Sequence, residues 1–427
     1  MEKLDEKYGC YLKIIKEELL PAFGCTEPIA IAYAAAKARE ILGSEPDTAV
    51  IEASSNIIKN VKSVVVPNTG GLRGIEAAAA VGIIAGKADK ELECICEVSP
   101  AQIEQIRRFL SEKQLRVKLS NSPFIFLIQI DLQHGEEHAS VRIANYHTNI
   151  VRIEKNGNVL FEKEAEAGSE DLTDRSLLNV ADILDFAETV ALEDVDDVIS
   201  RQIEFNSRIA VEGIRGNYGA NIGRVLLSTR PNDVALRARA MAAAASDARM
   251  SGCELPVVIV SGSGNQGITA SVPVIEYAKE LGASREKLIR SLVLSDLVTI
   301  HQKTGIGRLS AFCGAVSAGC GSGAGIAYLC GGGYEEISHT IVNALAIVSG
   351  MICDGAKASC AAKIATAVES GILGYQMFCK GQQFKSGDGI ITKGVEANIA
   401  NVGRLAKEGM RETDREIVSI MTGYHES

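Results

Sequence analysis

Residues Leu309–Tyr334 read LSAFCGAVSAGCGSGAGIAYLCGGGY, a stretch without a single charged side chain. Small residues dominate it, so its transfer into lipid is unfavourable and a membrane span is a poor interpretation. Gly321, Gly323 and Gly325, with the glycines at 331–333, are expected to interrupt a helix. The stretch therefore predicts a buried, tightly packed helical hairpin at the centre of a helical C-terminal domain.

Helical periodicity continues on both sides of this stretch. Helices are predicted at Asp171–Leu178, Val180–Ala191, Val195–Arg215, Val234–Met250, Val272–Leu281, Arg285–Thr304, Glu335–Cys353, Lys357–Gly371 and Gly394–Glu408. The N-terminal residues 1–46 also favour helices, at Leu4–Leu20 and at Ile29–Leu42. We expect residues 168–427 to form the helical catalytic domain, with residues 1–46 packing back on it.

Residues 47–167 have a different texture, because apolar and polar residues alternate in short runs. Strands are predicted at Thr48–Ala53, Val64–Pro67, Cys94–Val98, Phe124–Leu132, Ala139–Ala144, Ile150–Glu154 and Val159–Lys163, and helices at Gly71–Ala85 and Pro100–Leu110. The predicted fold class is α+β: an Ala/Gly-rich helical catalytic domain with an inserted mixed α/β domain at residues 47–167.

Charge and cysteine content restrict the classes of function. The 427 residues carry a formal net charge of −10, which argues against nucleic acid or an anionic membrane as a partner. The first twenty residues contain no apolar signal-peptide core, so we expect a cytoplasmic protein. In a reducing compartment the 11 cysteines should be buried thiols, metal ligands or catalytic groups and not disulfides.

Three cysteines in the C-terminal third are candidate metal ligands: Cys313, Cys353 and Cys360. The Asp354-Gly355 pair is expected to end one helix just after Cys353 and to place Cys360 in the first turns of the next helix. Three thiolates rather than four would leave one iron of a cluster open to act as a Lewis acid. Spacing alone allows simple buried thiols equally well, and Cys320 or Cys330 could replace one ligand.

A fourth cysteine, Cys25, lies in the loop Phe23-Gly24-Cys25-Thr26-Glu27-Pro28 before the second predicted helix. A helix N-terminus lowers the pKa of a thiol, so Cys25 is a candidate general base or nucleophile. Glu27 would oppose a thiolate there. The alternative is a small buried residue beside a helix cap.

Two polar, glycine-containing loops could hold a substrate carboxylate. Candidate binding residues are Asn68, Thr69 and Gly70 in the first loop, and Ser263, Asn265 and Gln266 in the second. Backbone amides in such loops can approach an anion, although each loop could also be a tight turn. Neither contains a Walker motif. Lys357 is surrounded by no pyridoxal-phosphate signature, so pyridoxal phosphate is not expected.

The Cys25 loop, the Ser261–Gly267 loop and the Cys313/Cys353/Cys360 trio together resemble the L-cysteine desulfidase family, which is related to the alpha chain of iron–sulfur-dependent L-serine dehydratases. The resemblance extends over nearly the whole chain. It implies an oxygen-labile [4Fe–4S] cluster with one open iron, held by Cys313, Cys353 and Cys360. It also implies Cys25 as the base and the conversion of L-cysteine to pyruvate, ammonia and hydrogen sulfide.

Two other functions agree with the same residues. One is an L-serine dehydratase of the same mechanism, and the other is a non-enzymatic iron–sulfur redox or carrier protein. The expected partner is a small amino-acid substrate, and the Ala/Gly-rich helical faces would allow a homodimer. Competing assays of L-cysteine and L-serine distinguish the two enzymes, and absence of turnover would favour the carrier.

Overall fold

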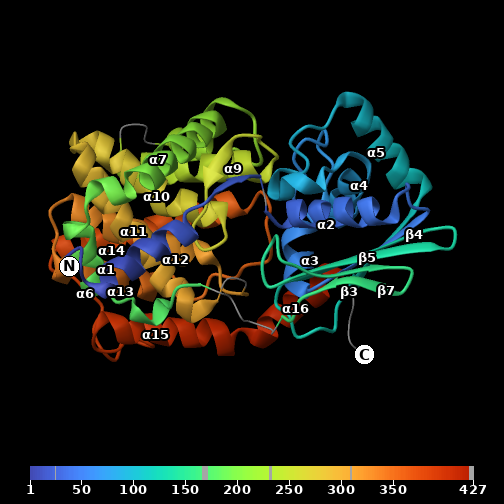
Figure 1. Ribbon diagram of the computed structural model, residues 1–427. Helices are drawn as coiled ribbons and strands as arrows, with labels where there is room; N and C mark the ends of the chain where they lie inside the picture. The colour runs from blue at the N-terminus through green and yellow to red at the C-terminus, as the bar shows by residue number, and fades with distance from the viewer. Residues whose placement is uncertain (25, 166–171, 230–232, 308–309, 423–427) are drawn as a thin grey trace.

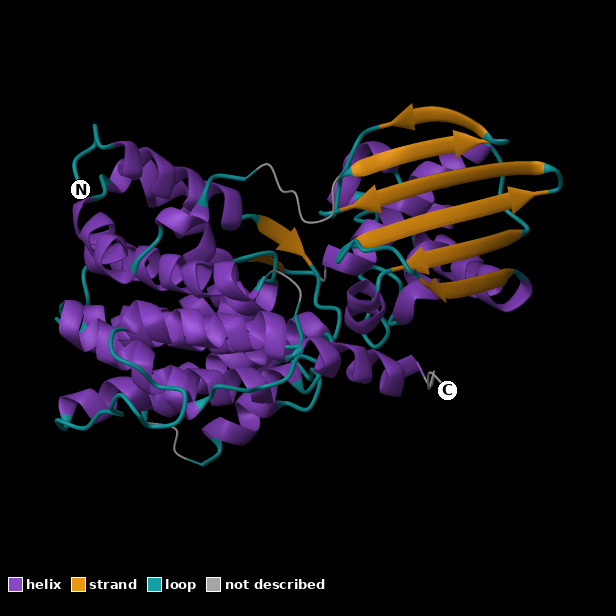
Figure 2. Cartoon of the chain, turned by 90° about the horizontal axis from the view of Figure 1, so that it is seen from below, coloured by secondary structure: helices purple, strands orange, loops and turns teal. Residues whose placement is uncertain are grey.

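The computed structural model of the chain describes residues 1–24, 26–165, 172–229, 233–307 and 310–422. A helical part and a sheet part lie side by side (Figure 1). In the sheet part, helices cover one face of a six-stranded mixed sheet (Figure 2). This arrangement confirms the predicted α+β fold class. None of the helices within the described ranges is both long and apolar enough to cross a membrane.

The sheet has the strand order β3-β2-β4-β5-β6-β7. Its strands are β2 (Thr48–Ala53), β3 (Gln114–Leu119), β4 (Leu127–His134), β5 (Glu137–Ala144), β6 (Ile150–Lys155) and β7 (Asn158–Glu162). Only β2 and β3 pair in parallel. Alternate residues of β2, such as Ile51, are buried, because helices α2 (Thr26–Leu42) and α4 (Gly74–Ala85) cover that face (Figure 1), and α5 (Pro100–Glu112) packs on α4.

Two strand predictions in this part are wrong. Val64–Pro67 forms only an isolated bridge, between Val65 and Arg73. Cys94–Val98 is a turn after the 3₁₀ helix η1 (Ala88–Glu93). Cys94 and Ile95 are buried because they join the core around α2, so their apolar character reflects contact with a helix and not pairing in a sheet.

The helical part contains α1 and the helices after residue 179. They are α1 (Glu6–Glu18), α6 (Val180–Thr189), α7 (Leu192–Arg215), α8 (Ile222–Leu227), α9 (Val234–Met250), α10 (Gly264–Leu281), α11 (Arg285–Ile306), α12 (Gly314–Leu329), α13 (Tyr334–Ile347), α14 (Cys360–Cys379), α15 (Val395–Arg404) and α16 (Arg411–Thr422). Short strands β1 (Pro21–Phe23) and β8 (Pro256–Val258) pair antiparallel. The helix predicted at Asp171–Leu178 is only the 3₁₀ turn η2 (Arg175–Leu177) in its described residues, and α3 (Ser55–Val61) belongs to the sheet part.

The predicted hairpin at Leu309–Tyr334 is a single helix, α12. Its glycines do not break it, because they let neighbouring helices approach closely. A Cβ built at Gly323 would lie 2.7 Å from the Cα of Gly371 on α14, and one at Gly321 would lie 2.2 Å from Oγ1 of Thr299 on α11. Contacts this close gain packing energy that outweighs the low helix propensity of glycine.

Two separate hydrophobic cores divide the N-terminal segment. Tyr8–Ala22 contribute to the core of the helical part, whereas Ile29–Leu42 contribute to the core of the sheet part. The segment 1–46, which we expected to pack as a whole on the helical domain, is therefore shared between the two parts. The chain passes from one to the other between β1 and α2.

Candidate functional site

A cavity of about 690 Å³ lies where the two parts meet. The helical part contributes loop and helix-end residues to its wall, including Ser263, Gln266 and all three candidate ligand cysteines. The sheet part contributes Asn56, Lys59, Asn60, Phe126, Asn145, Tyr146 and His147. The structure thus brings residues from distant stretches of sequence to one cavity.

A short backbone pairing brings Cys313 and Cys353 together. Phe312 and Ile352 form an isolated antiparallel bridge. The amide of Cys313 donates to the carbonyl of Met351 at 2.9 Å, and the amide of Cys353 donates to the carbonyl of Ala311 at 2.6 Å. Helix α13 ends at Ile347, so Cys353 lies in an extended loop and not at the end of a helix as we expected. Cys360 is the first residue of α14.

The thiols of Cys313 and Cys353 interact directly. The hydrogen bond from Cys313 lowers the pKa of Cys353, and nearby Lys59 acts in the same direction against the effect of burial. The same hydrogen bond, with burial, raises the pKa of Cys313. Burial also raises the pKa of Cys360, whose Sγ lies 3.5 Å from the carbonyl oxygen of Gly355. One thiol of the trio is therefore favoured as a thiolate.

Three helices begin at the cavity wall. Ser263 caps α10, Cys313 caps α12, and Cys360 opens α14. The first amides of a helix lack intrahelical partners and carry partial positive charge. Several such ends around one cavity stabilise negative charge, whether on thiolates or on a bound anion.

All three members of the cysteine trio line the cavity. Within the described residues, no three His, Cys, Asp or Glu side chains are grouped to hold one metal ion. The alternative ligands do not line this cavity: Cys320 is buried inside α12, and Cys330 caps its far end.

The two predicted anion loops occupy different places. Ser263, Asn265 and Gln266 line the cavity. Asn68 lies beside a separate cavity of about 180 Å³, and its Nδ2 donates to the carbonyl of Ile95 at 2.9 Å. Thr69 Oγ1 donates to the carbonyl of Val66 at 2.7 Å, and neither Thr69 nor Gly70 lines the main cavity. Among the described residues, only the second loop accompanies the cysteines.

Cys25, the predicted base, lies outside the described residues. Glu27, two positions later at the start of α2, is buried and lines the cavity. Asn60 Nδ2 donates to Glu27 Oε1 at 3.1 Å. The segment after Cys25 therefore enters the wall of the site.

Buried cations that line the cavity were not among the residues predicted from the sequence. Lys59 has a side chain only 1% exposed, and its Nζ lies 2.5 Å from Asp414 Oδ1 on α16. Its carbonyl oxygen also fixes the cysteine loop, because a Cβ at Gly355 would lie 2.0 Å from it. The sequence signal for a buried cation was the position of Lys59 directly after the apolar pair Ile57-Ile58.

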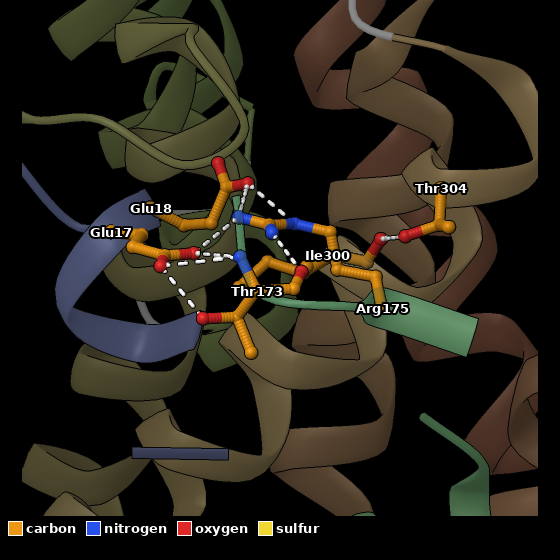
Figure 3. Close-up of polar contacts among 6 residues, drawn as sticks. All are labelled: Glu17, Glu18, Thr173, Arg175, Ile300 and Thr304. Atoms are coloured by element: carbon orange, nitrogen blue, oxygen red, sulfur yellow. Dashed lines mark hydrogen bonds and ion pairs between the residues drawn. The ribbon is translucent and has the colours of Figure 1, made fainter. Parts of the chain in front are cut away.

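Two arginines line the cavity as well. Figure 3 shows Arg175 between Glu17 and Glu18 of α1, with Thr173 bonded to Glu17 and Thr304 bonded to Ile300. Arg175 Nη2 lies 3.0 Å from Glu17 and 2.7 Å from Glu18, so its charge is compensated. The second, Arg249 near the end of α9, is 5% exposed and takes part in no ion pair with a described carboxylate. It comes shortly after five small residues, Ala242–Ser246. Such a run predicts close helix packing and does not indicate a buried charge.

The chain is similar to known proteins over most of its length. The profile of the serine dehydratase alpha chain matches residues 89–419, a range that includes Arg249, the Ser263–Gln266 loop and the three cysteines. A UPF0597 protein of Desulfitobacterium hafniense is 64% identical over 422 residues, covering 99% of this chain and 98% of its own length. UPF0597 proteins of Lachnoclostridium phytofermentans and Treponema denticola are 53% and 47% identical, each covering 97% of this chain and 99% and 98% of their own lengths.

Proposed function

The chain belongs to the serine dehydratase alpha-chain family, and from that premise we propose that it is an iron–sulfur-dependent L-cysteine desulfidase. The reaction is an α,β-elimination: L-cysteine and water give pyruvate, ammonia and hydrogen sulfide. The convergence of Cys313, Cys353 and Cys360 on one cavity carries the proposal. A non-enzymatic cluster carrier would not need the polar side chains that line the same cavity, such as Arg249 and Gln266.

The proposed cofactor is a [4Fe–4S] cluster held by Cys313, Cys353 and Cys360. When bound, it would supply an open iron as a Lewis acid toward the substituent on the substrate β-carbon. The helix ends at Cys313 and Cys360 favour the negative charge of the thiolates. Lys59 adds a buried positive charge close to Cys353.

The remaining steps use groups of the chain itself. The loop Ser263–Gln266 binds the charged end of the substrate, and the N-terminus of α10 favours its carboxylate. Cys25, as thiolate, removes the Cα proton while the β-substituent departs. Because the Cα–H of an amino acid is weakly acidic, this step needs a fixed orientation and exclusion of water. The enamine product tautomerises and is hydrolysed to pyruvate and ammonia without further help.

An anaerobic assay tests the proposal. Protein purified without oxygen should release pyruvate and sulfide from L-cysteine in a 1:1 ratio, as the reaction stoichiometry requires. L-serine should give pyruvate with a kcat/KM at least about tenfold lower, a difference of 1.4 kcal/mol in the transition state. A higher kcat/KM for L-serine would assign the chain as an L-serine dehydratase, and turnover of neither amino acid would refute the enzyme.

A further inference from the structure

We propose that Arg249 and Gln266 form a subsite for the zwitterionic end of an α-amino acid. The guanidinium of Arg249 binds the α-carboxylate, and the side-chain oxygen of Gln266 accepts a hydrogen bond from the α-ammonium. This inference rests on the proposed function, because it names the residues that fix the substrate while its β-carbon reacts.

Arg249 is a buried cation with no balancing anion among the described residues. Its side chain lines the cavity and the residue is 5% exposed. Nη1 donates to Asn265 Oδ1 at 3.3 Å, whereas Nε is buried and has no hydrogen-bond partner in the described part of the chain. A buried charge is costly unless an opposite charge compensates it. A carboxylate, which a guanidinium binds with two parallel hydrogen bonds, would supply that compensation.

Two other cations that line the cavity already have acidic partners. Arg175 contacts Glu17 and Glu18 (Figure 3), and Lys59 contacts Asp414. Binding a substrate carboxylate at either would require an existing ion pair to break. Arg249 requires no such exchange, which makes it the better anchor for an incoming anion.

Gln266 supplies the complementary polar atom. It is 5% exposed, lines the cavity, and its Oε1 has no hydrogen-bond partner among the described residues. Its side chain packs on Gly314, where a Cβ would lie 2.6 Å from the Gln266 Cδ. Gly314 follows Cys313 directly, so the subsite adjoins the cysteine trio. A small amino acid held at its zwitterionic end would present its β-substituent toward the thiols.

The glycine at position 264 keeps the guanidinium in place. A Cβ there would lie 2.4 Å from Arg249 Nε and 2.8 Å from Cζ, so any larger residue would displace the group. Gly264 is also the first residue of α10. The close approach therefore fixes Arg249 beside the amides at the start of that helix, which favour an anion at the same point.

Calorimetric titration of the anaerobically purified protein with two unreactive probes tests the subsite. L-alanine carries both charged groups, and pyruvate carries the carboxylate alone. Arg249→Gln should raise the Kd of both probes at least about 30-fold, as expected for the loss of a charge-assisted pair. Gln266→Leu should weaken L-alanine about tenfold and leave pyruvate unchanged. Arg237→Gln is the matched control, because Arg237 on the same helix pairs with Glu276 and Glu280.

Gly264→Ala keeps every charge and should weaken both probes by displacing Arg249, so it tests the proposal if Arg249→Gln does not fold. Unchanged binding in the folded Arg249→Gln variant, or in Gly264→Ala if that variant alone folds, would overturn the subsite, as would absence of binding to the unmodified protein. Since neither probe is turned over, Arg249-dependent binding without sulfide release from L-cysteine would preserve the subsite and refute the desulfidase.

Discussion

The two parts of the molecule contribute different things to the cavity. The helical part places Cys313 and Cys360 at the starts of α12 and α14, which pack closely where Gly323 meets Gly371, and it places Cys353 in an extended loop. The sheet part contributes loop residues and one buried ammonium group, that of Lys59. The three candidate ligands thus come from the helical part, whereas the sheet part adds a buried positive charge to the same cavity.

The largest effect is expected at Cys25, between β1 of one part and α2 of the other. Cys25→Ser should lower kcat for sulfide release about 10²- to 10⁴-fold, the usual contribution of a general base. Its iron content should equal that of the unmodified protein. The measurement is an anaerobic sulfide assay beside iron analysis. An active Cys25→Ser protein would place the base elsewhere in the cavity.

A second variant breaks the close packing of the helical part. In Gly323→Val the added side chain would meet the backbone of Gly371, and overpacking of this kind costs about 1–3 kcal/mol or more. The Tm should fall by about 1–3 °C, since a chain of this length has an unfolding entropy of about 0.9 kcal/mol/K. Gly9→Ala is the control, since a Cβ there has no neighbour within 4 Å. Equal Tm values for the two variants would mean that the glycines are not needed for helix contact.

A third variant tests the contribution of the sheet part. Lys59→Met leaves the Asp414 carboxylate without its 2.5 Å partner, and the protein should lose about 1–3 kcal/mol of stability. Asp414→Asn combined with Lys59→Met should recover part of that loss, because the unpaired charge is gone. Strictly additive effects in urea unfolding would show that the pair is not coupled.

The last prediction concerns pH. Burial raises the pKa of Asp296 on α11 to about 8 from an ordinary value of 3.8, although the amide of Gln202 opposes this. Since the folded protein binds this proton more tightly, the stabilisation is complete below pH 3.8 and is lost as pH rises toward 8. Asp296→Asn should therefore gain stability relative to the unmodified protein between these limits. Parallel urea-unfolding profiles from pH 5 to 8.5 would contradict the assignment.

The sequence predicted regular elements better than it predicted the site. The bounds predicted for α9 and β2 agree with the structure, because both have clear local periodicity. Strand β3 was missed, since its polar residues become a strand only through parallel pairing with β2. The helix through Gly319–Gly325 depends on contacts with α11 and α14 that no local pattern reveals.

The site residues differ in the same way between those with a local sequence pattern and those that depend on long-range contacts. Cys313, Cys353 and Cys360 were named from the sequence, and the structure places all three at one cavity. Arg249 and Lys59 were not named, because their importance arises from burial and from the partners they have or lack. Residues Asn68–Gly70 were predicted to be an anion loop, yet Asn68 donates to the carbonyl of Ile95 and Thr69 donates to that of Val66.

Iron and acid-labile sulfide in anaerobically purified variants test the central claim most directly. Cys313→Ser, Cys353→Ser and Cys360→Ser should each lose most of the iron of the unmodified protein. Cys320→Ala and Cys330→Ala should keep it, because neither residue lines the cavity. Full iron in any of the first three, or loss of iron from either of the last two, would contradict the assignment of the cysteine trio as the cluster ligands.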